Sequence, residues 1–230
     1  MNEQSQSVLT GYAGALTADR DRVLRNTYWL LALSLVPTVL GAWVGVTTGI
    51  MASMGTGLSL IVFFAGAFGL MFAVEKTKNS SAGVWMLLAF TFFMGLMLSR
   101  LLAAVLGFKN GTNLIMYAFG GTAAVFFAMA SLSTVIKRDL SGMGKFLFVG
   151  AILLLVVGVI NVFVQSSALM ITLAVLAIGI FSAFMLYDLK RVIDGGETNY
   201  ISATLAIYLD IYNVFQSLLA LLGIFGGERE

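Results

Sequence analysis

The 230-residue sequence contains no cysteine and no histidine. Disulfide bonds, thiolate chemistry, zinc sites built on these residues and imidazole general bases are therefore excluded. Charge is also scarce, because only 10% of the residues are Asp, Glu, Lys or Arg, whereas soluble domains carry about 25%. The formal net charge of +2 is too small to indicate nucleic-acid binding. Any response to pH must then rest on carboxyl groups.

Apolar side chains are abundant, at 60% of the residues, as is typical of a polytopic membrane protein. A hydrocarbon core about 30 Å thick requires roughly 20 apolar residues in a helix. Uncharged runs of that length, without the alternating pattern of barrel strands, predict an all-α integral membrane protein with seven transmembrane helices. The expected spans are residues 26–47, 52–74, 83–106, 113–136, 146–165, 168–188 and 201–225.

Lysines and arginines are distributed unevenly between the two sides of these spans. Ten lie on the side of the N-terminus, two lie on the other side, and Arg100 lies inside the third span. Because cytoplasmic loops carry an excess of positive charge, this bias predicts a cytoplasmic N-terminus. Residues 1–25 are then a cytoplasmic tail without the features of a signal peptide, residues 26–225 form one membrane domain, and residues 226–230 are an external C-terminus.

Small residues recur at helical spacing in two of the spans. Gly41, Gly45 and Gly49 are four residues apart, and residues 120–124, "GGTAA", offer a second small face. Small side chains let helices approach closely where lipid supplies no hydrophobic drive for association. We therefore expect both faces to be helix contacts.

Two charged residues lie well inside a span, where each costs about 2.5 to 3.5 kcal/mol at the helix centre. Arg100 is remote from the basic side, so its long stem can reach the outer headgroups, and a counter-ion role is the alternative. Asp210 lies about nine residues, roughly 13 Å, into the last span, too deep for a short carboxylate to reach water. With Asn213, Ser217 and the flanking Gln216 it forms a polar stripe, expected to face protein or a water-filled pore.

Asp188, at the end of the sixth span, is the natural partner of Asp210. The two are 22 residues apart on either side of a short turn, so antiparallel helices would bring them to similar depths. Two close carboxylates in a poorly solvated site cannot both ionise cheaply and titrate as a coupled pair. Such a pair would act as a proton-operated latch, held by a shared proton and driven apart when the proton is lost. Alternatively, Asp188 is interfacial, beside Lys190 and Arg191, and Asp210 satisfies a buried backbone or tyrosine group.

Other chemistry is suggested more weakly. Carboxylate oxygens suit calcium, so Asp188 and Asp210 are candidate ligands for a transient calcium ion. The polar turn with Asp194, Glu197 and Asn199 is typical of a solvated loop, or could recruit cations or a protein partner. Two membrane aspartates also resemble an intramembrane aspartyl protease, but the expected G-x-G-D context is missing at both. We therefore expect a protein that is not an enzyme and has no cofactor, with calcium as a possible permeant ion.

Several segments carry a family resemblance. The stretch "YDLKRVIDGGETNYISATLAIYLDIYNVFQSLLALLG" resembles the Bax inhibitor-1 family, the transmembrane Bax inhibitor motif (TMBIM) proteins. The segments "VLRNTYWLLALSL", "FGGTAAVFF" and "KRDLSGMGKFLFVGAILLLV" are similar to its bacterial YccA-like branch. The resemblance runs from about Val23 to Gly223, and "GGETNY" with the following helix is its most specific part.

This resemblance implies six helices wrapped around a central C-terminal helix, in the bacterial inner membrane. It also implies a pH-sensitive calcium leak gated by two aspartates, and Asp188 in "LYD" and Asp210 in "YLD" match their positions. Members described as leak channels carry a basic residue in the second helix that locks onto the sixth-helix aspartate. Here that helix is uncharged until Glu75. Lys76 is a possible substitute partner, and Arg100 is a more distant one.

The sequence leaves two functions open. One is a pH-sensitive cation leak, for calcium, through the membrane. The other is modulation of the membrane protease FtsH by protein contact, because the nearest branch is associated with restraint of that protease through the cytoplasmic tail. Residues 1–22 would supply that tail here.

Overall fold

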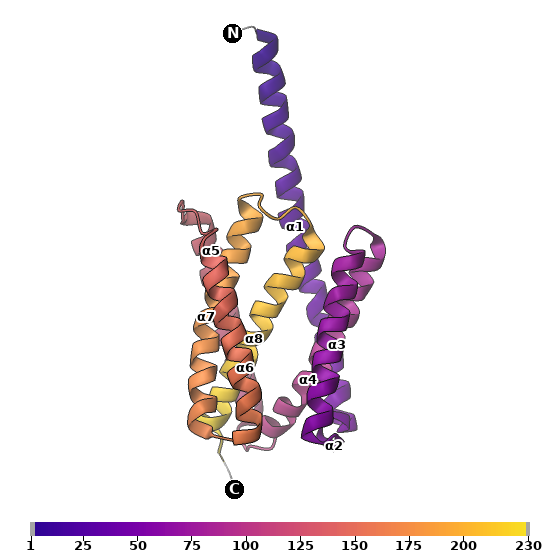
Figure 1. The fold of residues 1–230 in the computed structure, drawn as a ribbon, viewed down its shortest axis with the longest axis vertical. Helices are drawn as coiled ribbons and strands as arrows, with labels where there is room; N and C mark the ends of the chain where they lie inside the picture. The colour runs from indigo at the N-terminus through magenta and orange to yellow at the C-terminus, as the bar shows by residue number, and fades with distance from the viewer. Residues whose placement is uncertain (1–2, 229–230) are drawn as a thin grey trace.

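The chain folds into a helical bundle (Figure 1). The computed structural model describes the backbone of residues 3–228 and the side chains of residues 19–228. The helices are α1 (Glu3–Thr48), α2 (Ile50–Ser53), α3 (Thr56–Thr77), α4 (Ser81–Leu106), α5 (Gly111–Val135), α6 (Met143–Val164), α7 (Ser167–Ile193) and α8 (Tyr200–Gly226).

Seven of these helices are long and apolar enough to cross a membrane, counted over the described residues. Hydrocarbon offers no hydrogen-bond partners, so the backbone of each span must bond within its own helix. The predicted all-α fold with seven spans is therefore confirmed. The segment predicted as a tail is itself helical from Glu3, and the same helix continues to Thr48 with Pro37 inside it. In Figure 1, α1 accordingly extends well beyond the bundle.

The turns between helices gather at two ends of the bundle. Residues 78–80, 136–142 and 194–199 lie at the end from which α1 extends, and this end is called the basic end because of the lysines and arginines in and beside these turns. Residues 49–55, 107–110 and 165–166 lie at the opposite end, called the distal end. This arrangement agrees with the charge alternation in the sequence.

Helix α8 occupies the centre of the bundle. It contacts α1, α3, α4, α5 and α7, and Figure 1 shows it running obliquely between the other helices. Its largest fully buried side chains are Tyr208, Ile201 and Ile207. Helix α6, in contrast, packs on α7 and buries none of its residues, all of which the structure describes. Five membrane-spanning helices thus pack directly on a central last helix, and α6 lies outside them against α7.

Close packing of α1 against α4 depends on glycine. A Cβ atom at Gly41 would overlap the carbonyl oxygen of Phe92, and one at Gly95 would overlap that of Thr38. The predicted contact face on α1 is thus confirmed at Gly41. Gly49 has another role, because it adopts φ 64° at the start of α2, a conformation that residues with a Cβ atom rarely adopt.

The second small face, residues 120–124, does not form the expected close helix contact along its length. A Cβ atom at Gly121 would meet the side chain of Leu218 at 3.2 Å. At Gly120 it would meet nothing within 4 Å. The expectation was therefore wrong for Gly120, which borders open space instead of a neighbouring helix.

Candidate functional site

The turn between α7 and α8 sets the position of both candidate aspartates. Helix α7 ends at Ile193, and Gly195 follows in the left-handed region at φ 79°, as is common where a helix terminates. Helix α8 then begins with Asn199, whose side-chain oxygen accepts the backbone N–H groups of Ile201 at 2.9 Å and Ser202 at 3.2 Å. These end signals fold the chain back, so the two helices pack together.

Asp188 and Asp210 meet across the interface between α7 and α8. Their carboxyl groups lie within hydrogen-bonding reach of each other, and Asp210 is only 4% exposed. Ionised carboxylates only accept hydrogen bonds, so a bond between the two groups requires a proton on one of them. The buried oxygen Oδ2 of Asp210 has no partner among the described residues. Buried polar atoms are rarely left in that state, and a shared proton offers the missing interaction.

The nearby tyrosines do not satisfy Asp210. The hydroxyl of Tyr208 lies 2.9 Å from the hydroxyl of Thr38 and 3.4 Å from the carbonyl oxygen of Thr91. The hydroxyl of Tyr212 donates to the carbonyl oxygen of Met94 at 3.2 Å. Both tyrosines therefore hold α8 to α1 and α4, which leaves the two aspartates facing each other.

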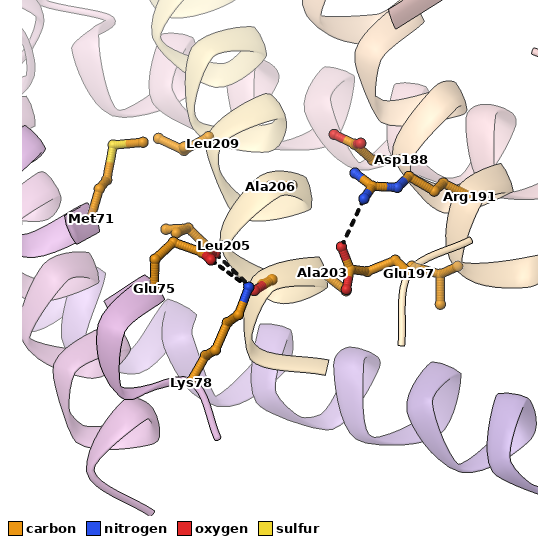
Figure 2. A pocket seen from close by; sticks show the side chains of 12 residues that line it. Met71, Glu75, Lys78, Asp188, Arg191, Glu197, Ala203, Leu205, Ala206 and Leu209 are labelled. Atoms are coloured by element: carbon orange, nitrogen blue, oxygen red, sulfur yellow. Dashed lines mark hydrogen bonds and ion pairs between the residues drawn. The ribbon is translucent and has the colours of Figure 1, made fainter. Parts of the chain in front are cut away.

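A cavity of about 380 Å³ leads from the basic end to Asp188 (Figure 2). Its inner wall is apolar, and its outer part carries charged and polar groups. Asp188 lines it, whereas the more deeply buried Asp210 does not. The lining residues are Met71, Glu75, Lys78, Asp188, Arg191, Val192, Glu197, Ser202, Ala203, Leu205, Ala206 and Leu209. Water and ions that enter the cavity therefore meet the pair through Asp188.

Arg191 is the basic residue of α7 that lines the cavity. It lies three residues after Asp188 on that helix, and both line the cavity. Its Nη2 atom is 3.2 Å from Oε2 of Glu197, and Figure 2 shows Arg191 between Asp188 and Glu197. The guanidinium of Arg191 thus lies beside two carboxyl groups, those of Asp188 and Glu197.

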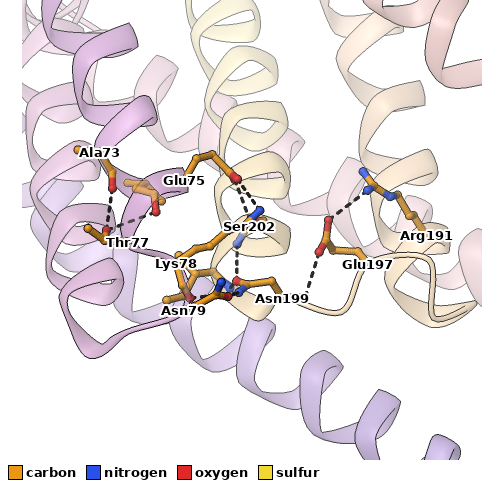
Figure 3. A network of polar contacts seen from close by, with 11 residues as sticks. Ala73, Glu75, Thr77, Lys78, Asn79, Arg191, Glu197, Asn199 and Ser202 are labelled. Carbon is orange, nitrogen blue, oxygen red and sulfur yellow. Dashed lines mark hydrogen bonds and ion pairs between the residues drawn. The ribbon is translucent and has the colours of Figure 1, made fainter.

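A polar network surrounds the mouth of the cavity (Figure 3). Nζ of Lys78 lies 2.6 Å from Oε2 of Glu75, and the hydroxyl of Ser202 donates to Oε1 of the same carboxylate at 2.8 Å. The side-chain amide of Asn199 donates to the carbonyl oxygen of Lys78 at 3.1 Å and to Oδ1 of Asn79 at 3.0 Å. Glu197 joins this group through the backbone N–H of Asn199 at 2.9 Å. The network therefore ties α7, α8 and the turn after α3 into one rim.

The contribution of the rim to stability can be tested by substituting Asn199. Asn199→Ala removes the cap of α8 and both bonds to the turn after α3, so we expect a loss of about 1 to 2 kcal/mol of stability. Asn199→Asp keeps the accepting oxygen but loses the two donors, so its stability should be intermediate. Ser166→Ala, which removes one longer capping bond of 3.3 Å to Leu169 on α7, is the matched control. Thermal unfolding in detergent measures all three, and equal midpoints for Asn199→Ala and Ser166→Ala would contradict this account.

None of the other residues predicted as a basic partner or as part of the polar stripe lines the cavity. Lys76 and Arg100 are exposed and do not line the cavity. The side-chain amide of Asn213 donates to the carbonyl oxygen of Leu209 in its own helix at 2.8 Å. Gln216 is exposed, and Ser217 is half-buried. Arg191 is thus the basic residue beside Asp188 in the cavity. The sequence indicated it only as one of two basic residues at the end of the sixth span.

The supply of metal ligands at the site is small. Among the described residues, no group of three or more His, Cys, Asp or Glu side chains is placed to hold a metal ion. Asp188 and Asp210 offer two carboxyl groups, and Arg191 adds a competing positive charge. Calcium prefers six to eight oxygen ligands, so the arrangement suits passing contact with a cation better than storage.

Comparison with known proteins places this arrangement in a family. The family model described as inhibitor of apoptosis-promoting Bax1 matches residues 20–227. The chain belongs to this Bax inhibitor family. The match includes all seven spans almost completely, together with both aspartates and the turn between them.

Several relatives are similar over nearly their whole length. A membrane protein of Vibrio cholerae is 39% identical over 90% of this chain and 92% of its own. The Escherichia coli K12 protein named modulator of FtsH protease YccA is 39% identical over 88% of this chain and 90% of its own. A Pseudomonas aeruginosa protein is 36% identical over 98% of this chain and 99% of its own. The resemblance to the YccA-like branch is therefore confirmed.

Proposed function

We propose that this Bax inhibitor family protein is a pH-sensitive leak channel for calcium in the bacterial inner membrane, gated by Asp188 and Asp210. The observation that carries the proposal is the meeting of these two carboxyl groups at the inner end of a cavity that opens at the basic end. Charged residues inside a membrane domain generally mark ion or proton pathways. The basic end is assigned to the cytoplasm because positive charge is enriched there, which puts the C-terminus outside.

Gating follows from the chemistry of the pair. With one shared proton, the carboxyl groups bond to each other and hold α7 against α8. When the proton leaves, two like charges remain at the interface, and their repulsion favours separation of the helices. Arg191 can then form an ion pair with either Glu197 or the newly charged Asp188, both of which lie beside it in the cavity. The rim would thus respond to the same proton.

The test is calcium flux into liposomes that contain the purified chain, measured over a pH series. We expect flux above that of empty liposomes, rising as the pH is raised through the titration of the pair. Flux equal to that of empty liposomes at every pH would refute the channel.

A second function is favoured by one relative. The Escherichia coli K12 relative is named as a modulator of FtsH protease, so we propose as the alternative that this chain modulates FtsH by protein contact. Residues 1–22 are the proposed contact. The backbone of the described part of this segment continues directly into the first membrane span, so a protease in the same membrane would meet it at the basic end.

Removing residues 1–22 tests this alternative. We expect the truncated chain, reconstituted with purified FtsH, to restrain substrate degradation less than the full chain does. Calcium flux of the same truncated chain serves as the control, because the aspartate pair lies outside the deleted segment. Identical FtsH turnover with full and truncated chains would count against a contact through this segment.

A further inference from the structure

A second and larger cavity of about 950 Å³ opens on the side of the bundle, away from the aspartate pair. Helices α4 and α8 form its floor, and α1 and α5 form its two sides. The sides meet at Tyr28 and Phe126, whose rings pack edge to face with centroids 6.3 Å apart. Beyond this contact, α1 and α5 form no extended interface within the described residues. The cavity is therefore a groove that is closed toward the basic end.

The groove offers almost nothing to a polar ligand. The hydroxyl of Thr122 donates to the carbonyl oxygen of Ala118 at 2.7 Å, and that of Thr38 donates to the carbonyl oxygen of Ser34 at 2.8 Å. The hydroxyls of Tyr208 and Tyr212 are likewise engaged with groups of the protein, as described above. The rest of the lining is apolar apart from the hydroxyl of Tyr28 and the indole N–H of Trp43, so an occupant must be held mainly by van der Waals contact.

Hydrocarbon is the medium that surrounds the groove. All four of its walls are membrane-spanning helices. Its rim is exposed at Trp43 (64%), Phe119 (63%) and Phe127 (66%), so the groove is continuous with the lipid-facing surface. Left empty, the lining would lose its dispersion contacts on one side. Its volume is within the range of about 300 to 1,000 Å³ found for small-molecule sites.

Gly120 adds room to the groove. On α1 and α4, Gly41 and Gly95 are small because another backbone lies against them. Gly120 lines the groove, and a Cβ atom there would meet nothing within 4 Å. Glycine inside a helix lowers its stability by about 1 kcal/mol relative to alanine, and here no helix contact offsets that cost. The space is thus available to an occupant from outside the protein.

We propose that this groove is a lipid site that holds one acyl chain of a phospholipid, inserted from the distal leaflet between α1 and α5. The chain enters where the two helices are apart and ends before the contact of Tyr28 with Phe126. It lies against Tyr208 and Tyr212, on the face of α8 that does not carry Asp210. The lipid completes the packing of α1 with the bundle, and this role does not depend on ion conduction.

Photo-cross-linking tests the lipid site. The full chain is reconstituted in vesicles of phosphatidylethanolamine and phosphatidylglycerol with a small fraction of phosphatidylethanolamine that carries a diazirine on one acyl chain. Mass spectrometry then locates the labelled residues. We expect labelling of the groove residues of α1 and α5 to exceed that of exposed α6 residues such as Phe148 and Phe163 several-fold. Equal labelling of both surfaces would show ordinary boundary lipid and would overturn the proposal.

A filled groove provides the matched comparison. Gly120→Phe should lower labelling of the groove several-fold, whereas Gly158→Phe on α6, where a Cβ atom also meets nothing within 4 Å, should leave it unchanged. Ala123→Leu, a smaller change in the same groove, serves if Gly120→Phe does not fold. Unchanged labelling in these groove variants refutes the site. Labelling by a free diazirine fatty acid but not by the phospholipid, or cross-links between two copies through the groove, would assign it to another occupant.

Discussion

Asp210→Asn is expected to abolish the pH dependence of calcium flux and to hold the flux at its low, acidic level. The asparagine amide donates a hydrogen bond to Asp188 without needing a proton, so α7 and α8 stay joined at every pH. Two like charges about 4 Å apart repel each other by about 4 kcal/mol at an effective protein dielectric of about 20. Removing this repulsion should therefore lower the flux at high pH by at least about tenfold, which corresponds to 1.4 kcal/mol.

Asp139→Asn is the control for that experiment. Asp139 lies in the turn between α5 and α6, fully exposed, where the backbone N–H and the hydroxyl of Ser141 both donate to its carboxylate. These bonds hold the pKa of Asp139 below its ordinary value, so it stays ionised when the pH is raised from neutral. The variant should retain the full pH response. A pH response that survives Asp210→Asn, or disappears in Asp139→Asn, would place the sensor elsewhere.

Gly95→Ala is expected to cause a large loss of stability, because a methyl group at this position has no room in the bundle. The new Cβ atom would overlap the carbonyl oxygen of Thr38 and lie 3.0 Å from the backbone nitrogen of Ala42. These are backbone atoms of α1, so a side-chain rotation cannot relieve the clash. Overpacking of this kind costs about 1 to 3 kcal/mol, and the separation of α1 from α4 would add to it. The midpoint of thermal unfolding in detergent, followed by tryptophan fluorescence, measures the effect.

Gly69→Ala is the comparison, because a Cβ atom at that position of α3 meets nothing within 4 Å. Alanine is the better helix former by about 1 kcal/mol, so this variant should be as stable as the natural chain or slightly more so. If Gly95→Ala and Gly69→Ala unfolded at the same temperature, the close approach of α1 and α4 would not be needed for stability.

The number of spans followed from the sequence, because membrane thickness dictates the length of each uncharged run, whereas the central place of the last helix was implied by the family resemblance. The meeting of Asp188 with Asp210 also followed, since a short turn between two antiparallel helices leaves little freedom in their relative depth. Hydrophobic run length and hairpin geometry are local properties, which a single sequence contains. The role of Gly41 in helix packing could likewise be predicted, because the spacing of small residues is also a local property.

The basic partner and the lateral groove did not follow. Arg191 reaches Glu197 because Gly195 turns the chain with a positive φ, and this i, i+6 contact matches no helical periodicity. The groove exists because α1 packs on α4 and leaves α5 apart, which is a property of three helices from distant parts of the sequence. Gly120 resembled a helix contact for the same reason, since spacing does not reveal whether a small face meets a helix or a space.

The unbroken course of α1 has a mechanical consequence. Its membrane-spanning part is fastened to α8 by the contact of Thr38 with Tyr208 and by the hydroxyl of Thr204, which donates to the carbonyl oxygen of Thr27 at 3.3 Å. The backbone from Glu3 to Ala18 continues the same helix by about 24 Å at 1.5 Å per residue. A stiff rod fixed at one end magnifies a tilt at the other. Any tilt of α1 within the membrane would thereby be delivered as a larger displacement at a point well clear of the lipid surface.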